Sequence, residues 1–254
     1  MHKLQLHLKS SVLFLLILLV WYVLSQLQLW SSFVLPGPGK VLTAFQEMCQ
    51  NGELLESIYV SFRRIFLGFC LAAMLAFGFA ITSLLIPGAK PYYAGVLNFL
   101  RNVPPLTLIP LLILWFGIGE LPKIIVIILA SFFPLLLNLD SGFAGCDQKL
   151  LEVGKVLGFS QREILTKIIF PYSLPYIVVG MRIALGYSLR AIIGAEMIAA
   201  SSGLGYLILD AQTLSRSDKV LVGIIVIGLL GIGLDWLFAL FIRHHFPYRT
   251  EVTS

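Results

Sequence analysis

Charge is scarce in this sequence. Charged residues make up 12% of the 254 residues and hydrophobic residues 58%, and the mean hydropathy is +0.93. A soluble domain of this length could not bury so much apolar surface in one core. We therefore predict an all-α integral membrane protein, in which roughly 20 apolar residues form each crossing and about six crossings fill the chain. No stretch is left for a separate soluble domain, so residues 1–254 are expected to form a single transmembrane domain.

Groups that usually perform chemistry are also rare. The three cysteines lie in different segments without metal-ligand spacing, and the four histidines lie near the two ends of the chain. We therefore expect no metal site, no disulfide framework and no catalytic residue. Gly37 and Lys40 stand close together, but no Gly-x-x-x-x-Gly-Lys-Ser/Thr phosphate loop occurs, which argues against ATP hydrolysis by this chain. The net charge of +5 is scattered, so nucleic acid is not an expected partner.

Six apolar runs are predicted to cross the membrane. They cover about residues 12–29, 65–85 (opened by Arg63 and Arg64), 92–117, 124–138, 176–200 and 220–242. A cleaved signal peptide is the rival interpretation of the first run, which is long and has no small-residue cleavage site before the next loop.

The third run is interrupted by Arg101 and by Pro104 and Pro105. Such a break is costly in lipid unless the freed backbone and the guanidinium face other helices or water. Arg101 is then either a structural clamp in a kinked helix or part of a translocation path.

The fifth run is the least apolar, because it holds Arg182, Tyr187, Arg190 and Glu196. Ionisable groups inside a membrane are functional candidates by default. Arg190 and Glu196, with Tyr187 nearby, could bind an anionic solute and its counter-charge. The alternative is an internal ion pair or a hydrogen-bonded brace that only sets packing. Because the two residues are six positions apart, they fall on different faces of one helix.

The longest charged interval, residues 147–171, separates the fourth and fifth runs. Its apolar residues recur at spacings of three and four and predict a short helix, Gly158 permits a turn, and Ser160 begins a Ser-x-x-Glu capping box for a second helix. Pro171 and Pro175 are expected to end that second helix. Two short amphipathic helices are thus predicted outside the membrane. A generic surface helix lying on lipid headgroups is the alternative.

This interval resembles the EAA loop of permease subunits of bacterial ATP-binding-cassette (ABC) importers. The family pattern is Glu-Ala-Ala, three residues, Gly, nine residues, Ile, and a Pro shortly after. Here valine and Gly154 replace the two alanines after Glu152, whereas Gly158, Ile168 and Pro171 keep the spacing. The resemblance implies a cytoplasmic loop whose short helix docks into a groove on a separate ATPase subunit. The residues then expected to couple to the ATPase are Glu152, Gly154, Gly158, Phe159, Arg162, Ile168 and Pro171.

Other stretches resemble the nitrate, sulfonate and taurine branch of these permeases, which also includes transporters for pyrimidine-type vitamin precursors. They are residues 101–105, 110–120, 180–182, 196–197 and 203–206. The resemblance implies the type I ABC importer permease fold (MetI-like), with a core at 57–243 and no cofactor in this chain. It also implies a homodimer of permeases, a dimer of ATPase subunits that hold ATP and Mg, an extracytoplasmic substrate-binding protein, and a bacterial inner membrane.

Lysine and arginine are concentrated in alternate loops, which places both termini and the EAA-like loop on the cytoplasmic side. The expected function is that of the permease subunit of an ATP-driven importer for a small anionic solute. One alternative is the same kind of complex carrying a vitamin precursor. Another is an ion-coupled secondary transporter, which also uses broken spans and buried charges, although no inverted repeat relates residues 12–117 to 121–242.

Overall fold

The described part of the chain is helical and contains no strand. The computed structural model describes residues 2–27, 29–86 and 88–245, and of residues 2–11, 14, 241 and 243–245 only the backbone. Lys3, Lys9 and Arg249, on which the predicted side of the termini partly rests, lie outside the described side chains. In chain order the elements are α1 (His2–Gln26), α2 (Pro38–Gln50), α3 (Glu53–Leu85), α4 (Lys90–Asn102), the 3-10 helix η1 (Pro105–Leu108), α5 (Ile109–Phe116), α6 (Glu120–Ala144), α7 (Gln148–Val156), α8 (Gln161–Ile164), the π-helix η2 (Leu165–Ile169), α9 (Phe170–Ala199), α10 (Leu204–Thr213) and α11 (Ser217–His245).

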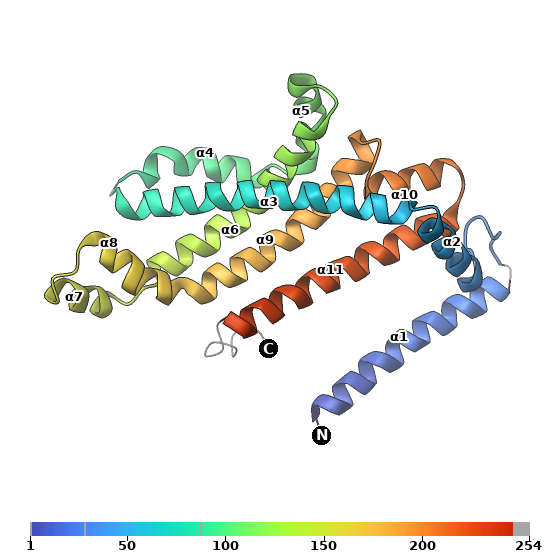
Figure 1. The fold of residues 1–254 in the computed structure, drawn as a ribbon, viewed down its shortest axis with the longest axis horizontal. Helices are drawn as coiled ribbons and strands as arrows, with labels where there is room; N and C mark the ends of the chain where they lie inside the picture. Colours follow the sequence, from blue (N-terminus) through green and yellow to red (C-terminus); the bar gives the residue numbers. More distant parts are fainter. Residues whose placement is uncertain (1, 28, 87, 246–254) are drawn as a thin grey trace.

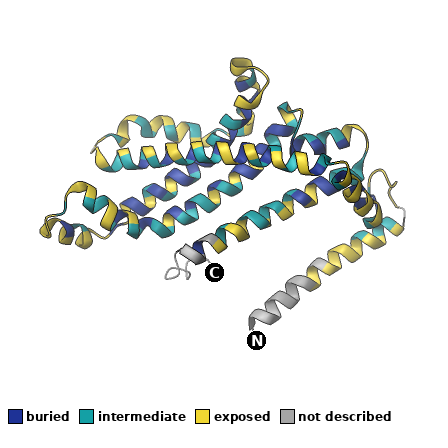
Figure 2. Ribbon diagram, viewed as in Figure 1, coloured by how far each residue is buried: buried dark blue, intermediate teal, exposed yellow. Residues whose placement is uncertain are grey.

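Helices α3, α6 and α9 form the centre of the molecule, and the buried residues follow them (Figure 2). Small residues let the three backbones approach closely. A methyl group on Gly68 of α3 would lie 2.6 Å from Ile127 of α6, and one on Gly180 of α9 would lie 2.7 Å from Asn138. The glycines are therefore part of the packing between spans.

The number of crossings is roughly consistent with the predicted six. By length and composition α3, α6, α11 and the segment Gln161–Ala199 can each cross a membrane. A fifth crossing results if α4 and η1–α5 count as one broken span. Helix α1 spans 25 residues, of which Leu15–Gln26 is the apolar part that is fully described. It stands apart from the other helices in Figure 1, and the indole Nε1 of Trp21 donates to the carbonyl of Pro36 at 3.1 Å.

Two predicted boundaries are wrong. Helix α3 begins at Glu53, so Arg63 and Arg64 lie inside it and do not open it. The third run is not one kinked helix, because α4 and η1–α5 meet at 91°. Val103 and Pro104 each precede a proline, which disfavours the helical conformation, and both adopt extended backbone.

The expectation that Pro171 and Pro175 end the second helix of the 147–171 interval is also wrong. The chain is helical from Gln161 to Ala199, with Pro171 in the first turn of α9 and Pro175 inside it. A proline removes one backbone hydrogen bond and crowds the preceding turn. The turn just before Pro171 is the π-helix η2, and a π turn is wider than an α turn. The wider turn accommodates the proline ring, so the helix continues.

Candidate coupling loop and buried ion network

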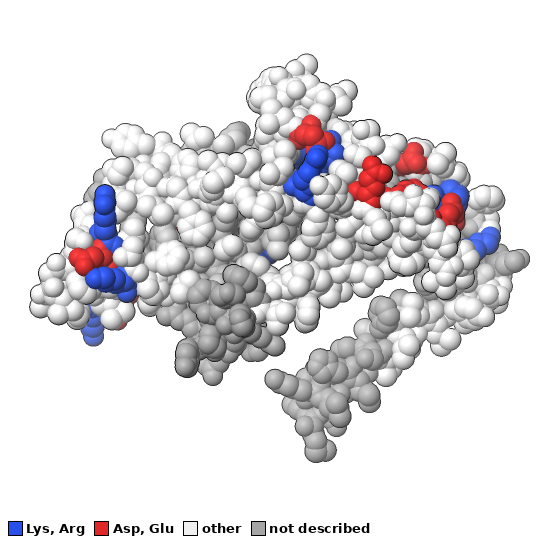
Figure 3. All heavy atoms as spheres, in the orientation of Figure 1, with Lys and Arg blue, Asp and Glu red and all other residues white. Residues whose placement is uncertain are grey.

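The candidate coupling loop, residues 147–171, which is called the coupling loop below, lies at one end of the molecule. It joins the C-terminus of α6 to the N-terminus of α9 and holds α7, α8 and η2 (Figure 1). Charged side chains gather over this end and again over the opposite half, with an uncharged surface between them on the face shown in Figure 3. The arrangement places two polar regions at opposite ends of the central helices.

Gly158 turns the chain between α7 and α8. Its φ is +75°, the left-handed region that glycine enters without a Cβ penalty. The N–H of Phe159 donates to the carbonyl of Gly154 at 2.9 Å, and the N–H of Gly158 donates to that of Lys155 at 3.0 Å. These two bonds are the Schellman pattern that satisfies the last carbonyls of a helix. The predicted glycine turn is therefore present, with a defined hydrogen-bond pattern.

Gly154 and Ile168 meet in space, although they lie in different helices of the loop. A methyl group on Gly154 would approach within 2.5 Å of Ile168 Cδ1 and within 3.6 Å of the Phe159 ring. Gly154 is buried, whereas Glu152 and Arg162 are exposed. The EAA-like spacing thus brings α7 against η2 and leaves the charged residues on the outside.

Helix α8 carries the predicted capping box. The N–H of Glu163 donates to Ser160 Oγ, and Glu163 Oε2 accepts from the backbone N–H of Ser160 at 3.0 Å. Lys167 Nζ donates to Glu163 Oε1 at 2.8 Å and lies 4.8 Å from the centre of the Phe159 ring. These contacts therefore brace α8 and η2 from within, in addition to the packing of Ile164, Leu165 and Ile168 against the hydrophobic core.

The loop also exposes apolar surface. Val153, Val156 and Leu157 of α7 and its C-terminal turn are exposed, and Val156 retains 87% of its accessible surface. Exposed apolar residues next to charged ones are typical of a surface that binds another protein. The loop thus has the composition of a docking surface.

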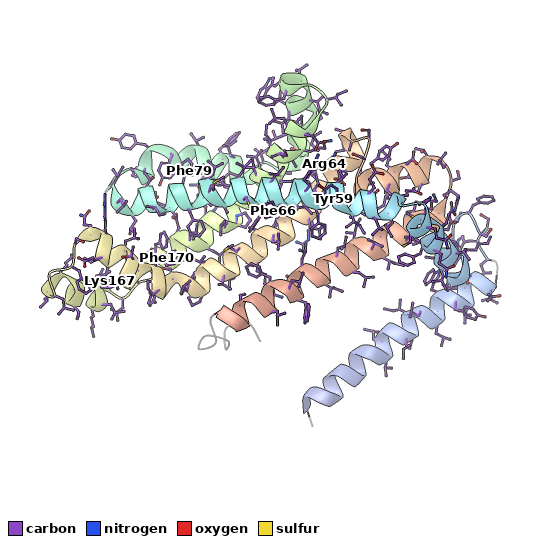
Figure 4. All side chains as sticks on the ribbon, in the orientation of Figure 1. Tyr59, Arg64, Phe66, Phe79, Lys167 and Phe170 are labelled. Carbon is purple, nitrogen blue, oxygen red and sulfur yellow. The ribbon has the colours of Figure 1, made fainter. Side chains whose placement is uncertain are left out.

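The second polar region is a buried network centred on Arg64 of α3. Its Nε and Nη2 donate to the two carboxylate oxygens of Glu120 at 2.7 and 2.6 Å, and its Nη1 donates to Glu196 Oε1 at 2.7 Å. Nη1 also donates to the carbonyl of Ser202 at 2.7 Å. One guanidinium therefore connects α3, the N-terminus of α6, the C-terminal part of α9 and the turn before α10. Arg64 and Lys167 mark the two polar regions in Figure 4.

Glu196 caps the N-terminus of α10, which has no side-chain cap of its own. Its carboxylate accepts from the N–H of Gly205 at 3.0 Å and from Ser61 Oγ, and Ser61 Oγ accepts from the N–H of Leu204. A carboxylate near the N-terminus of a helix is favoured by the helix dipole. A methyl group on Gly203, whose φ is +111°, would lie 2.4 Å from the Glu196 carboxylate. The glycines of the 203–206 stretch therefore make room for this cap.

A third ion cluster lies beside the network, between α2, the start of α3 and the start of α11. Arg216 Nη2 donates to Glu47 Oε2 at 3.0 Å, and Lys219 Nζ donates to Glu53 Oε2 at 2.7 Å. The hydrogen bond from Arg216 is the main reason that the pKa of Glu47 lies below its usual value. These contacts fix α2 on the ends of α3 and α11.

Comparison with known proteins assigns the chain to a family. A family model described as the inner membrane component of binding-protein-dependent transport systems matches residues 89–245, which is more than half of the sequence. The chain belongs to this family. The permease therefore shares its core with the membrane-spanning subunits of such systems.

Curated relatives agree with this assignment. The putative aliphatic sulfonates transport permease protein SsuC of Bacillus subtilis (strain 168) is 38% identical over 223 residues, 88% of this chain and 81% of the relative. The taurine transport system permease protein TauC of Escherichia coli (strain K12) is 32% identical, with 93% and 88% covered. The nitrate import permease protein NrtB of Synechocystis sp. is 29% identical, with 91% and 86% covered. The protein is a transmembrane permease subunit of an ABC importer.

Solved structures confirm the predicted fold. The permease matches a chain of the MetNI methionine ABC transporter in an inward-facing conformation with a TM-score of 0.63 and 17% identity, covering 76% of this chain and 94% of that one. It matches a chain of an amino acid ABC transporter crystallised with histidines with a TM-score of 0.67 and 13% identity, covering 79% and 97%. At these identities the match concerns the fold alone.

The four residues expected to line a path in the permease do not converge. Glu196 is buried in the Arg64 network, and Arg190 is exposed on another face of α9, where it stacks on Tyr187 at 5.7 Å. The structure thus places Arg190 and Glu196 apart, and the contacts of Glu196 fit the brace that the sequence offered as the alternative; a joint solute site of the two residues stays a prediction. Arg190 lines a cavity of about 550 Å³ between α9 and α11, together with Asp235. Tyr187 lies beside Arg190.

Arg101 lies in a different part of the permease from the other three residues. It lines a cavity of about 230 Å³ between α4 and α6. Lys90 and Asp140 line the same cavity and form an ion pair of 2.6 Å. Arg101 is exposed at the end of α4, just before the 91° bend. It is therefore separate from both the Arg190 cavity and the Arg64 network.

Sequence reasoning missed the centre of the network, Arg64, and its partners Ser61 and Glu120. A signal was present in α3. Small residues at 61, 68, 72, 76 and 80 follow a helical spacing and mark the buried face of α3, and Arg64 lies on that face. A buried arginine needs an acidic partner, and Glu196 is the one acid in the fifth run.

Proposed function

We propose that two copies of this permease form the translocation path of an importer for a small sulfonate-type anion, driven by two ATPase subunits. The coupling loop carries the proposal, because its capped α8, its Gly158 turn and its exposed apolar and charged side chains suit a groove on a partner protein. The named activities of the relatives in sulfonate, taurine and nitrate transport support the solute class.

In this proposal the coupling loop is cytoplasmic, as are both termini, in a bacterial inner membrane. ATP and Mg are held by the ATPase subunits, and closure of that pair moves the docked loops. Because α8 is continuous with α9, movement of the loop passes directly into a membrane-spanning helix. The two permease copies then alternate between states open to either side. An external binding protein delivers the solute at the end of the permease that carries Arg64.

The decisive experiment replaces Gly158 with valine in the complex reconstituted into vesicles. A β-branched residue at a φ of +75° is strained, so we expect the turn and the docking of α8 to change while the membrane core remains assembled. Uptake of taurine or methanesulfonate per ATP hydrolysed should fall on the order of tenfold, a loss of about 1.4 kcal/mol in coupling. The matched control is Gly52→Val, because Gly52 has a φ of +79° and equally open surroundings at the other end of the molecule.

Unchanged coupling in Gly158→Val, or equal losses in the two variants, would overturn the docking role of α8. A second readout concerns the side of the membrane. Cysteines placed at exposed positions 155 and 162 should react with a membrane-impermeant maleimide only from the cytoplasmic side. Uptake should also persist when a protonophore is added and ATP is maintained, since a secondary transporter would stop.

A further inference from the structure

The carboxylate of Glu120 is surrounded by positive charge. Arg64 binds both of its oxygens in a forked arrangement, Lys123 Nζ donates to Oε1 at 2.8 Å, and Arg63 Nη2 lies 3.7 Å from Oε2. The two acids of this cluster, Glu120 and Glu196, face three cations. The cluster therefore carries a net charge of one positive unit.

Its members differ sharply in exposure. The side chains of Arg64 and Lys123 retain only 2% and 5% of their accessible surface, whereas that of Glu120 retains 44%. Glu196 is fully buried and is also held by Ser61 and by the N–H of Gly205. In the described part of the chain, the Glu120 carboxylate accepts hydrogen bonds only from Arg64 and Lys123. Glu120 is thus the one acid of the cluster that can turn into solvent.

We propose that Arg64 and Lys123 form a binding site for the sulfonate group of the transported solute, and that the Glu120 carboxylate occupies this site when solute is absent. The nature of the solute rests on the proposed function. The forked guanidinium that binds two carboxylate oxygens fits two sulfonate oxygens equally well. Glu120 is also the first residue of α6, so the N-terminal dipole of that helix favours an anion at the same place.

Exchange of Glu120 for solute follows from the charges. Departure of Glu120 alone would leave the buried Lys123 without an acidic partner and Arg64 paired with Glu196 alone, which is unfavourable. Departure in exchange for another anion keeps them paired. Glu120 follows Gly117 and Gly119, and Gly117 has a φ of +75°, so the chain before it has the backbone freedom for such a movement. The site would therefore never be empty, and it would select for negative charge.

The position of this site suits entry from outside. It lies at the N-terminus of α6 and near the C-terminus of α9, whereas the coupling loop lies at the opposite ends of the same two helices. The same guanidinium holds the turn at Ser202 that leads into α10. Occupation of the site by solute would therefore act on the end of α9 that is remote from the ATPase.

The test measures binding of radiolabelled methanesulfonate to the purified permease–ATPase complex in the absence of a binding protein. In Glu120→Gln the internal carboxylate is neutral, and we expect methanesulfonate to bind on the order of tenfold more tightly than in the wild type, the size of one charge-assisted hydrogen bond. Glu120→Asp, which keeps the charge on a shorter side chain, should lie between the two. Neutral dimethyl sulfone should bind neither to the wild type nor to these variants. The gain should disappear when Lys123→Gln is added to Glu120→Gln.

The matched control is Glu47→Gln, which removes another half-exposed acid paired with an arginine and a lysine. If Glu120→Gln binds no more tightly than Glu47→Gln, or if dimethyl sulfone binds as well as methanesulfonate, the inference is wrong. A second measurement, ATP-driven uptake of sulfonates by the wild-type complex with its binding protein, distinguishes failure of this inference from failure of the proposed function. Uptake of sulfonates without a gain in Glu120→Gln overturns the site alone. A gain in Glu120→Gln without any sulfonate uptake supports an anion site and overturns the solute class.

Discussion

The coupling loop and the Arg64 network are two polar regions of this permease that are built in opposite ways. In the loop the hydrogen bonds of the capping box and of the Glu163–Lys167 pair join residues three or four positions apart, and the side chains are largely exposed. In the network the bonds made by Arg64 and Ser61 join residues 56 to 143 positions apart, and Arg64 is buried. A region formed by local contacts can move as a unit when a partner grips it, whereas one formed by distant contacts holds the spans together.

This comparison predicts that substitutions in the network destabilise the whole protein. The largest effect is expected for Arg64→Ala. Removing one partner of a buried ion pair leaves an unpaired charge and costs about 3–5 kcal/mol. The thermal unfolding temperature of the purified complex in detergent should fall strongly. Arg63→Ala is the control, because Arg63 is half-exposed and an exposed pair contributes roughly 0–1 kcal/mol. Equal losses in the two variants would show that Arg64 is not the centre of the network.

The second-largest loss of stability is expected for Gly203→Ala. The backbone at φ +111° costs about 1–3 kcal/mol for a residue with a side chain, and the new methyl group would also press on the Glu196 carboxylate. We expect a lower unfolding temperature and faster hydrogen exchange in α10. Gly78→Ala in α3 serves as control, because no atom lies within 4 Å of a methyl group there. Retention of wild-type stability by Gly203→Ala would contradict the capping role assigned to Glu196.

In the coupling loop a smaller and local effect is expected for Ser160→Ala. Loss of an N-cap costs typically about 1 kcal/mol. Hydrogen exchange should accelerate in α8 and η2, while the unfolding temperature of the complex stays within error of the wild type. Ser141→Ala is the control, since Ser141 is also exposed and bonds only within α6. A fall in global stability in Ser160→Ala would mean that the cap, and not only the packing of Ile164 and Ile168 on the core, stabilises the whole protein.

The smallest effect is expected for Lys167→Ala, which removes the pair with Glu163 and the contact with the Phe159 ring. Such i,i+4 pairs contribute roughly 0.2–0.5 kcal/mol and are screened by salt. Hydrogen exchange in α8 should therefore differ between variant and wild type at low ionic strength and converge at high ionic strength. A difference that persists in molar salt would indicate packing by the lysine stem instead of charge.

The same contrast between local and distant contacts decides which features could be predicted from the sequence. The Gly158 turn, the Ser160 capping box and most of the apolar runs depend on residues a few positions apart, and the structure confirms them. The Gly154–Ile168 contact was not predicted, although both residues belong to the family spacing. Pro171 was misinterpreted because a π turn, which no short-range pattern reveals, precedes it.

The network could not be predicted in the same way. The Arg64 guanidinium meets Glu120 and Glu196 only after three helices pack, and the two acids lie on different helices. The sequence did show Glu196 as an unusual acid, but the nearest charge along the chain, Arg190, points elsewhere. Charge pairing within a membrane thus depends on tertiary structure, and adjacency in sequence is a poor guide to it.

The unbroken helix from Gln161 to Ala199 has one last consequence. Its 39 residues correspond to a rod of about 58 Å that begins in the coupling loop and ends three residues beyond Glu196. A π turn contains one more residue than an α turn, so a shift between the two at η2 would rotate everything beyond it by about 100°. In the proposed assembly the ATPase subunits act at the coupling-loop end, and rotation of the helix about its own axis would carry their movement to the opposite end without tilting the helix.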